Sequence, residues 1–208
     1  MLTEDAFAWK PPEPVKGRAR VQEVPSPLAD VRLAADELRE HLAKMSGADL
    51  EVVAQGADLA GRVPIYLDAA ADSKLEAMIR KQGSDPGAFA LLVGRDRVDV
   101  RGLSPEGTLF GVYELLEQLG VRWFFPGDLG QVIPESKDVS VKAQETVQFP
   151  SFPARWASGS VGKQKQWQRR LRMGGPHFPS AHGVRLPKTH SFAEHPEYYS
   201  LIGGVRKD

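Results

Sequence analysis

One helix signature occurs twice in the sequence and restricts strongly what the chain can form. Ser26-Pro27 supplies a capping hydroxyl and a proline at the first helical position. Apolar residues at spacings of three and four follow, and a glycine ends the pattern: Leu28, Val31, Ala35, Leu38, Leu42, Met45 and Gly47. Ser104-Pro105 opens the second such segment, whose members are Leu109, Val112, Leu116, Leu119 and Gly120. The patterns predict two amphipathic helices.

Charged residues of these helices are predicted to lie on the exposed side. Glu37 falls in this group, with Arg32, Arg39 and Glu40. Asp30 and Asp36 are also interpreted as surface charges. No pair of acidic residues is distinguished by its spacing, so no catalytic carboxylate is assigned.

The other segments of the first 150 residues favour short strands. Strands are predicted at residues 17–24, 50–53, 63–67, 88–94 and 98–101, and a further helix at 73–81. Arg95-Asp96-Arg97 is typical of a hairpin between the last two strands. The order of elements predicts an α+β fold, a two-layer α/β sandwich in which helices cover one face of a mixed sheet. An extended, mostly irregular C-terminal segment is expected to follow.

Charge is distributed unevenly, although 27 basic and 27 acidic residues balance. The sequence contains no acidic residue from Thr146 to Ala193, while eight basic residues fall there. With Pro150 and Pro153, this break predicts a domain boundary near residue 148. We expect an N-terminal arm at 1–19, a domain at 20–148 and the incomplete start of a following region at 149–208.

The basic stretch from Thr146 to Ala193 has few apolar residues at regular spacing and no acidic residue of its own. Residues 157–190 are therefore expected to be poorly ordered or held by intermolecular contacts. Nucleic acid is not expected as a partner, because the isoelectric point is about 7.0 and a solvated helix face gives the same local count of basic residues. No apolar run approaches the roughly 20 residues of a membrane helix, so no membrane span is expected.

Metal and cofactor chemistry is not indicated either. The chain has no cysteine, which excludes disulfides and zinc thiolate sites. Four of the five histidines fall in the C-terminal part without the His-x-x-x-His spacing of a helical metal site: His177, His182, His190 and His195. We interpret them as scattered loop residues and predict no metal and no cofactor.

Several motifs resemble part of known carbohydrate-active enzymes. Residues 102–127, GLSPEGTLFGVYELLEQLGVRWFFPG, resemble the last helix of the non-catalytic domain that precedes the barrel in glycoside hydrolase family 20 hexosaminidases and family 67 α-glucuronidases. Residues 34–48 are similar to that domain's first helix, and residues 131–134 to its closing segment. Residues 167–174, WQRRLRMG, and 195–206, HPEYYSLIGGVR, resemble a bacterial group of unknown function in which this domain leads into a barrel-like region.

The resemblance implies a non-catalytic accessory domain that packs against a following domain and shapes a sugar-binding cleft. It implies a carbohydrate partner, a uronate or an N-acetylhexosamine, and a secreted or periplasmic protein, although the first residues show no signal-peptide pattern. The catalytic carboxylates of those families lie in a barrel, which needs about 200 residues. We therefore expect no activity in this chain. A free-standing carbohydrate-binding or protein-interaction module is the alternative, and a small enzyme that uses the C-terminal histidines is a third.

Arg155, Trp156 and His190 are the candidate substrate-binding residues. Arg155 matches an arginine that holds sugar hydroxyls at the first barrel strand of the hexosaminidases, and Trp156, where those enzymes have glycine, would stack on a pyranose face. The competing interpretation pairs Arg155 with an acidic residue across the domain interface. The aromatic run Trp123-Phe124-Phe125 is predicted to seal this domain against the next one.

Overall fold

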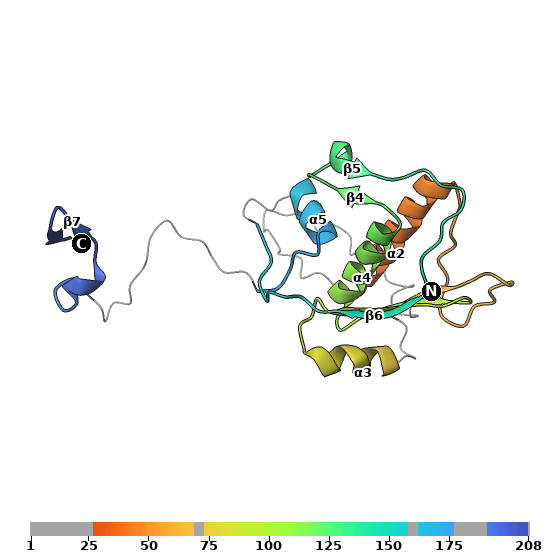
Figure 1. Cartoon of the computed structure of the whole chain (residues 1–208), viewed down its shortest axis with the longest axis horizontal. Helices are drawn as coiled ribbons and strands as arrows, with labels where there is room; N and C mark the ends of the chain where they lie inside the picture. The colour runs from red at the N-terminus through yellow and green to blue at the C-terminus, as the bar shows by residue number, and fades with distance from the viewer. Residues whose placement is uncertain (1–26, 69–72, 158–161, 177–190, 208) are drawn as a thin grey trace, which may run out of the picture. The chain divides into compact units, whose positions relative to one another are not determined.

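The computed structural model describes residues 27–68, 73–157, 162–176 and 191–207 (Figure 1). Contacts between residues divide the chain into two units, Met1–Pro176 and His177–Asp208. The boundary predicted near residue 148 falls inside the first unit and stays a prediction. Among the described residues, no helix is long and apolar enough to cross a membrane.

A four-stranded mixed sheet forms the centre of the first unit. Its strands are, in spatial order, β1 (Ile65–Leu67), β3 (Val98–Gly102), β2 (Phe89–Val93) and β6 (Gln144–Gln148). β1 runs parallel to β3, whereas the β3–β2 and β2–β6 pairs are antiparallel. β2 and β3 make the predicted hairpin, which the Gly94 N–H closes by donating to the Arg97 carbonyl at 2.9 Å.

The two helices predicted from their Ser-Pro and glycine boundaries lie on one face of this sheet. They are α2 (Pro27–Ser46) and α4 (Pro105–Gln118) (Figure 1). Ser104 caps α4, because its hydroxyl accepts from the Gly107 N–H at 3.3 Å. Gly47 and Gly120 follow the helices with φ angles of 75° and 97°, which favour glycine. The described residues of both apolar stripes are buried against Phe89, Leu91 and Val100, apart from Leu119, which is half-buried.

A third helix, α3 (Ser73–Gln82), covers the opposite face of the sheet (Figure 1). Leu75 and Ile79 pack there against Ala88 and Ala90. Because side chains alternate along a strand, the central strand β2 contributes to both apolar clusters. The predicted α/β sandwich with a mixed sheet is confirmed, and α3 adds a helical layer on its second face.

Two strand predictions have different outcomes. Residues 50–53 form an irregular segment instead of a strand, because Leu50 and Val52 pack onto the main apolar core without joining the sheet. The strand predicted at 17–24 lies outside the described residues. Beyond α4, β4 (Arg122–Trp123), η1 (Asp128–Gly130) and β5 (Gln131–Val132) form a short hairpin.

The second unit is small, and its hairpin exposes the apolar side chains of Leu201, Ile202 and Val205. It contains η2 (Pro196–Tyr198) and the hairpin of β7 (Leu201–Ile202) and β8 (Val205–Arg206). His195 stacks on Tyr198 with ring centroids 4.9 Å apart, and its Nδ1 lies 3.0 Å from Glu197 Oε1. This hydrogen bond lowers the pKa of the Glu197 carboxyl.

Helix α4 packs closely against the turn before β2 at Gly107, and a substitution of this glycine tests that contact. A Cβ atom there would lie 2.4 Å from the Ala88 carbonyl oxygen. Gly107→Ala is therefore expected to lower the free energy of unfolding by about 1–3 kcal/mol, and Tm by about 2–4 °C for each kcal/mol. Gly94→Ala is the control, since the nearest atom to its Cβ would be 3.4 Å away. Equal melting temperatures for the two variants would contradict this packing.

Candidate functional site

The basic stretch after residue 150 folds back onto the first block. Arg155 and Gly174 form a β-bridge in which the Arg155 N–H donates to the Gly174 carbonyl at 2.9 Å. Helix α5 (Lys163–Arg170) lies between them in the chain, and the Trp167 indole N–H donates to the Trp123 carbonyl at 2.9 Å. We call residues 155–157 and 162–176 the docked segment.

The prediction that residues 157–190 are poorly ordered or held by intermolecular contacts is therefore wrong for part of this range. Residues 162–176 pack within their own unit instead of being poorly ordered or held by intermolecular contacts. The reason is that their partners are distant in sequence, so the local composition gave no sign of them. Residues 158–161 and 177–190 lie outside the described residues.

Arginines of the docked segment pair with acidic side chains of the first block. Four sets form: Arg155 with Asp85 at 3.5 Å, Arg169 with Asp30 at 2.5 Å, Arg170 with Glu37 at 3.0 Å, and Arg172 with Glu117 at 2.7 Å and Glu114 at 3.5 Å. All of these side chains are less than a third exposed. The charge imbalance along the sequence is thus compensated inside one unit.

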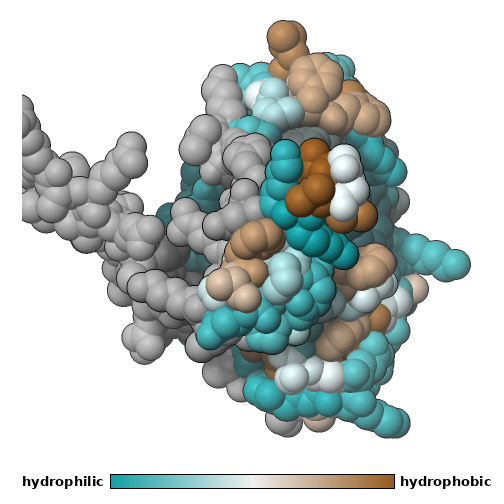
Figure 2. All heavy atoms as spheres, turned by 90° about the vertical axis from the view of Figure 1, so that its left-hand side faces the viewer, coloured by the Kyte–Doolittle hydropathy of each residue, from teal (hydrophilic) through white to brown (hydrophobic). Residues whose placement is uncertain are grey.

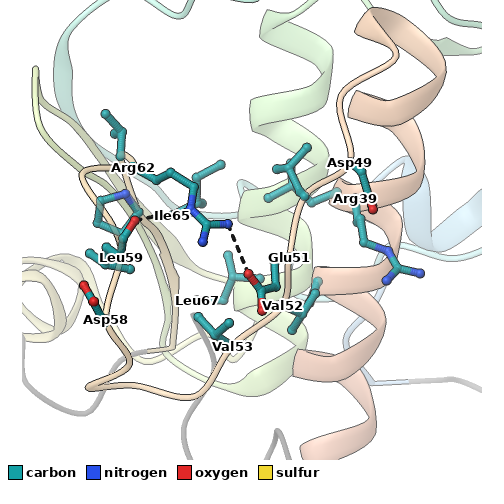
Figure 3. A pocket seen from close by; sticks show the side chains of 15 residues that line it. Arg39, Asp49, Glu51, Val52, Val53, Asp58, Leu59, Arg62, Ile65 and Leu67 are labelled. Atoms are coloured by element: carbon teal, nitrogen blue, oxygen red, sulfur yellow. Dashed lines mark hydrogen bonds and ion pairs between the residues drawn. The ribbon is translucent and has the colours of Figure 1, made fainter.

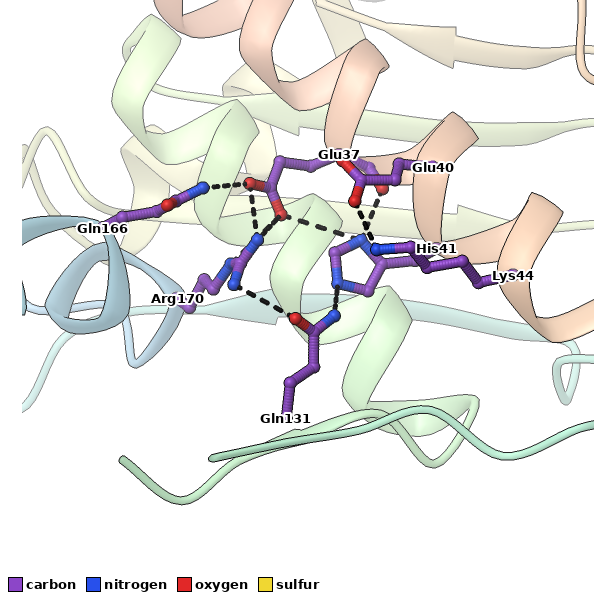
Figure 4. Close-up of polar contacts among 7 residues, drawn as sticks. All are labelled: Glu37, Glu40, His41, Lys44, Gln131, Gln166 and Arg170. Atoms are coloured by element: carbon purple, nitrogen blue, oxygen red, sulfur yellow. Dashed lines mark hydrogen bonds and ion pairs between the residues drawn. The ribbon is translucent and has the colours of Figure 1, made fainter. Parts of the chain in front are cut away.

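The centre of this interface is the pair of Glu37 and Arg170 (Figure 4). Glu37 is only 3% exposed and Arg170 12%, which makes the surface position predicted for Glu37 wrong. Arg170 Nη2 lies 3.0 Å from both carboxylate oxygens, and Gln166 donates to Glu37 Oε1 at 2.9 Å. The arginine also covers Trp123, 5.6 Å from its ring centroid. Such a fully hydrogen-bonded pair is the form in which a buried carboxylate is tolerated.

His41 extends the network toward β5. The imidazole is fully buried, and its Nδ1 lies 2.7 Å from the Glu37 carbonyl oxygen. Its Nε2 lies 2.7 Å from Gln131 Nε2, while Arg170 Nη1 lies 3.5 Å from Gln131 Oε1. Burial lowers the pKa of His41, although the carbonyl and the carboxylate of Glu37 oppose that effect. Glu37 and His41 are four residues apart and lie beside the apolar stripe of α2. This spacing is the sequence signal that could have indicated the cluster.

Arg155 lies beside a cavity of about 210 Å³ between the sheet and the docked segment. Its side chain is 17% exposed, its Nε donates to the Arg172 carbonyl at 3.2 Å, and its Nη1 donates to the Phe152 carbonyl at 2.5 Å. The ion pair with Asp85 corresponds to the competing interpretation, and a sugar contact stays a prediction. Trp156 is half-buried. His190 lies outside the described residues.

Glu106 faces the same region from the first turn of α4 and was not singled out in the sequence. Burial raises the pKa of its carboxyl, with Arg169 and Arg155 opposing and Asp30 and Asp85 reinforcing the shift. No sequence pattern marks this residue, because its environment arises only when the docked segment is in place.

A second cavity of about 190 Å³ opens between α2, residues 49–63 and β1 (Figure 3). Its walls are mainly aliphatic, from residues such as Leu38, Leu50, Val52 and Ile65. Arg62 and Glu51 form an exposed ion pair of 3.1 Å there. No aromatic side chain is among its described lining residues, so its chemistry suits an aliphatic group better than a sugar ring.

The aromatic run after α4 divides between core and surface. Trp123 is buried and packs edge-on against His41 and Tyr113, at centroid distances of 5.6 Å and 5.5 Å. Phe124 and Phe125 are 67% and 51% exposed, and Leu129 nearby is 94% exposed. Apolar side chains are visible at the upper end of the face in Figure 2, where this hairpin lies. Sealing against a further domain stays a prediction for the two phenylalanines, whereas Trp123 belongs to the core.

Comparison with known proteins gives a partial structural likeness to a solved structure. No family model matches the sequence, and no curated protein matches it. Among solved structures, a family GH115 4-O-methyl-α-glucuronidase with specificity for decorated arabinogalactans is 22% identical, with a TM-score of 0.47. The match covers 62% of this chain and 17% of that chain. Similarity at this level carries no argument about what this chain binds.

The importance of the buried pair is testable against an exposed pair on the same helix. Glu37→Gln leaves Arg170 buried without its counter-charge, so we expect a loss of about 3–5 kcal/mol in the free energy of unfolding. Glu40→Gln removes an ion pair with Lys44 whose side chains are 55% and 52% exposed, and should cost less than about 1 kcal/mol. Chemical denaturation of both variants measures the difference.

A double variant separates charge burial from packing. Glu37→Met/Arg170→Met removes both charges and keeps apolar bulk, so it should be more stable than Glu37→Gln. Equal losses for Glu37→Gln and Glu40→Gln would show that Glu37 is not buried in solution.

Proposed function

We propose that the chain is a non-catalytic accessory module of a glycoside-hydrolase-like, carbohydrate-active protein. Its role is to hold the start of the following region in a fixed register against α2 and α4. The observation that supports this role is the buried Glu37–Arg170 pair, together with the three further sets of ion pairs along the docked segment. The resemblance of residues 102–127 to the non-catalytic domain of family 20 and family 67 glycoside hydrolases supplies the carbohydrate context. Residues 167–174 resemble the bacterial group in which this domain leads into a barrel-like region.

Arginine–carboxylate pairs are suited to fixing a register. A guanidinium presents its donors in a rigid plane, so it accepts few orientations of a carboxylate. Four such arginines within residues 155–172 leave little freedom for the segment to slide on the domain. The chain would therefore leave the module at a defined place, which is what a following domain requires of its neighbour.

Within the docked segment, Arg155 is the best candidate for a contact with a sugar. Gly87 leaves room for it, because a Cβ there would lie 2.7 Å from Arg155 Nη2. That nitrogen is buried and has no hydrogen-bond partner among the described residues, so it retains donors for a ligand. A uronate carboxylate or sugar hydroxyls would satisfy them, in a cleft completed by the following region of a secreted or periplasmic protein.

The exposed hairpin residues would take part in the domain contact. Phe124, Phe125 and Leu129 together expose more apolar surface than scattered single residues do. A folded neighbour would cover them next to the docked segment. The same exposure favours the alternative of a free-standing module, which would use this surface for another protein.

Sugar titration of the chain alone separates the two functions. An accessory module whose cleft needs the following region should show no saturable binding of glucuronic acid or N-acetylglucosamine with Kd below about 1 mM. It should also release no nitrophenol from aryl glucuronides or hexosaminides, since glycoside cleavage needs two suitably placed carboxyl groups. Saturable binding by the isolated chain would favour the free-standing carbohydrate-binding module.

The role of Arg155 is testable in a protein that contains the following region. Arg155→Ala should weaken sugar binding by roughly 10- to 150-fold, because a charge-assisted hydrogen bond contributes about 1.5–3 kcal/mol. Arg169→Ala is the matched control, since it removes an ion pair with Asp30 from the same interface and Arg169 is not among the described residues that line the cavity beside Arg155. An unchanged Kd in Arg155→Ala, with a lowered Tm, would assign the residue to the interface alone.

A further inference from the structure

The network around His41 has hydrogen-bond directions that are fixed at both of its ends (Figure 4). A guanidinium only donates, so Gln131 must turn its amide oxygen to Arg170 and its amino group to His41. A backbone carbonyl only accepts, so His41 Nδ1 must carry the proton that it donates to Glu37. His41 Nε2 is then an acceptor, and only the neutral imidazole satisfies every contact.

We propose that this network is an acid-sensitive switch, in which protonation of His41 loosens Arg170 and releases helix α5 from the domain. A proton on Nε2 places a donor 2.7 Å from the amino nitrogen of Gln131. Rotation of the Gln131 amide relieves that conflict but turns the amino group toward Arg170 Nη1. Each arrangement therefore leaves two buried donors facing each other.

The charges that face His41 do not remove this conflict. Glu37 Oε2 lies 3.7 Å from Nδ1 and would attract an imidazolium, but the carboxylate is already paired with Arg170. Glu40 on the same helix is held by Lys44. Among the described residues, the other groups that face His41 are Gln131 from β5, Arg170 from α5 and the Trp123 ring from β4. A second cation beside Arg170 is thus unfavourable.

Helix α5 is the element that this change would release first. Its sequence, Lys-Gln-Lys-Gln-Trp-Gln-Arg-Arg, is polar, and Trp167 is its one apolar residue. The helix is held by the contacts of Gln166, Arg169 and Arg170 with α2. Trp167 adds a hydrogen bond to the Trp123 carbonyl and packs on the main core. The sheet and the main core contain their own apolar contacts and do not depend on this network.

The direction of the pH effect follows from the difference in proton affinity of His41 between the docked and the released state. His41 binds a proton less readily in the docked state than in the released state, because burial lowers its pKa. Docking is then fully stable above about pH 6.5, the ordinary value for histidine, and weakens as the pH falls below it. Uptake of one proton limits the change to about tenfold per pH unit in the docking equilibrium.

Amide exchange measured by NMR on the full chain between pH 7.5 and 5 tests the switch. After correction for intrinsic exchange, protection of the α5 amides should fall by up to tenfold per pH unit below about pH 6.5, while protection of β2 and β3 stays constant. The titration of the His41 ring should share its midpoint with this release. Protection of α5 that is independent of pH, or that is lost together with β2, would overturn the proposal.

Two variants keep the test independent of any folding defect at His41. Gln131→Leu leaves His41 able to titrate but removes its connection to Arg170, so the pH dependence of α5 protection should decrease strongly. His195→Gln changes an exposed histidine of the second unit and should leave it unaltered. A wild-type pH dependence in Gln131→Leu would show that the connection through Gln131 is not the cause.

Discussion

Glu37 lies in the middle of α2, almost wholly removed from water, and Arg170 supplies the charge and the hydrogen bonds that its burial requires. The two residues are 133 positions apart in the chain. Their contact joins helix α2 to the basic stretch that follows the sheet. The cavity beside Arg155, the environment of Glu106 and the buried state of His41 all depend on that docking.

The sequence predicted the elements whose signals are local. Capping serines, prolines, apolar stripes and terminal glycines located α2 and α4. The predicted strands at 88–94 and 98–101, joined by Arg95-Asp96-Arg97, located the central hairpin. β6 and α5 were not predicted, because Gln-Glu-Thr-Val-Gln and the polar sequence of α5 have no apolar periodicity of their own. Both are stabilised by partners far away in the chain.

The residues of the candidate site likewise divide into those with a local sequence signal and those without one. Arg155 was indicated by its place in a motif, whereas Glu37 was interpreted as a surface residue because it lies off the apolar stripe of its helix pattern. The break in charge near residue 146 was interpreted as a boundary between domains. In the structure it also reflects complementarity, since acidic residues of the first block and arginines of the docked segment neutralise one another. Anchoring and acid-sensitive release are two consequences of that single interface.

A distance measurement across the interface tests the docking most directly. The chain has no cysteine, so spin labels at Glu40→Cys on α2 and Lys165→Cys on α5, both exposed positions, would be the only ones present. Docking within one molecule predicts a single narrow distance distribution at pH 7.5 that does not change on dilution or on mixing with unlabelled protein. A broad distribution, or one that changes on dilution, would contradict the account.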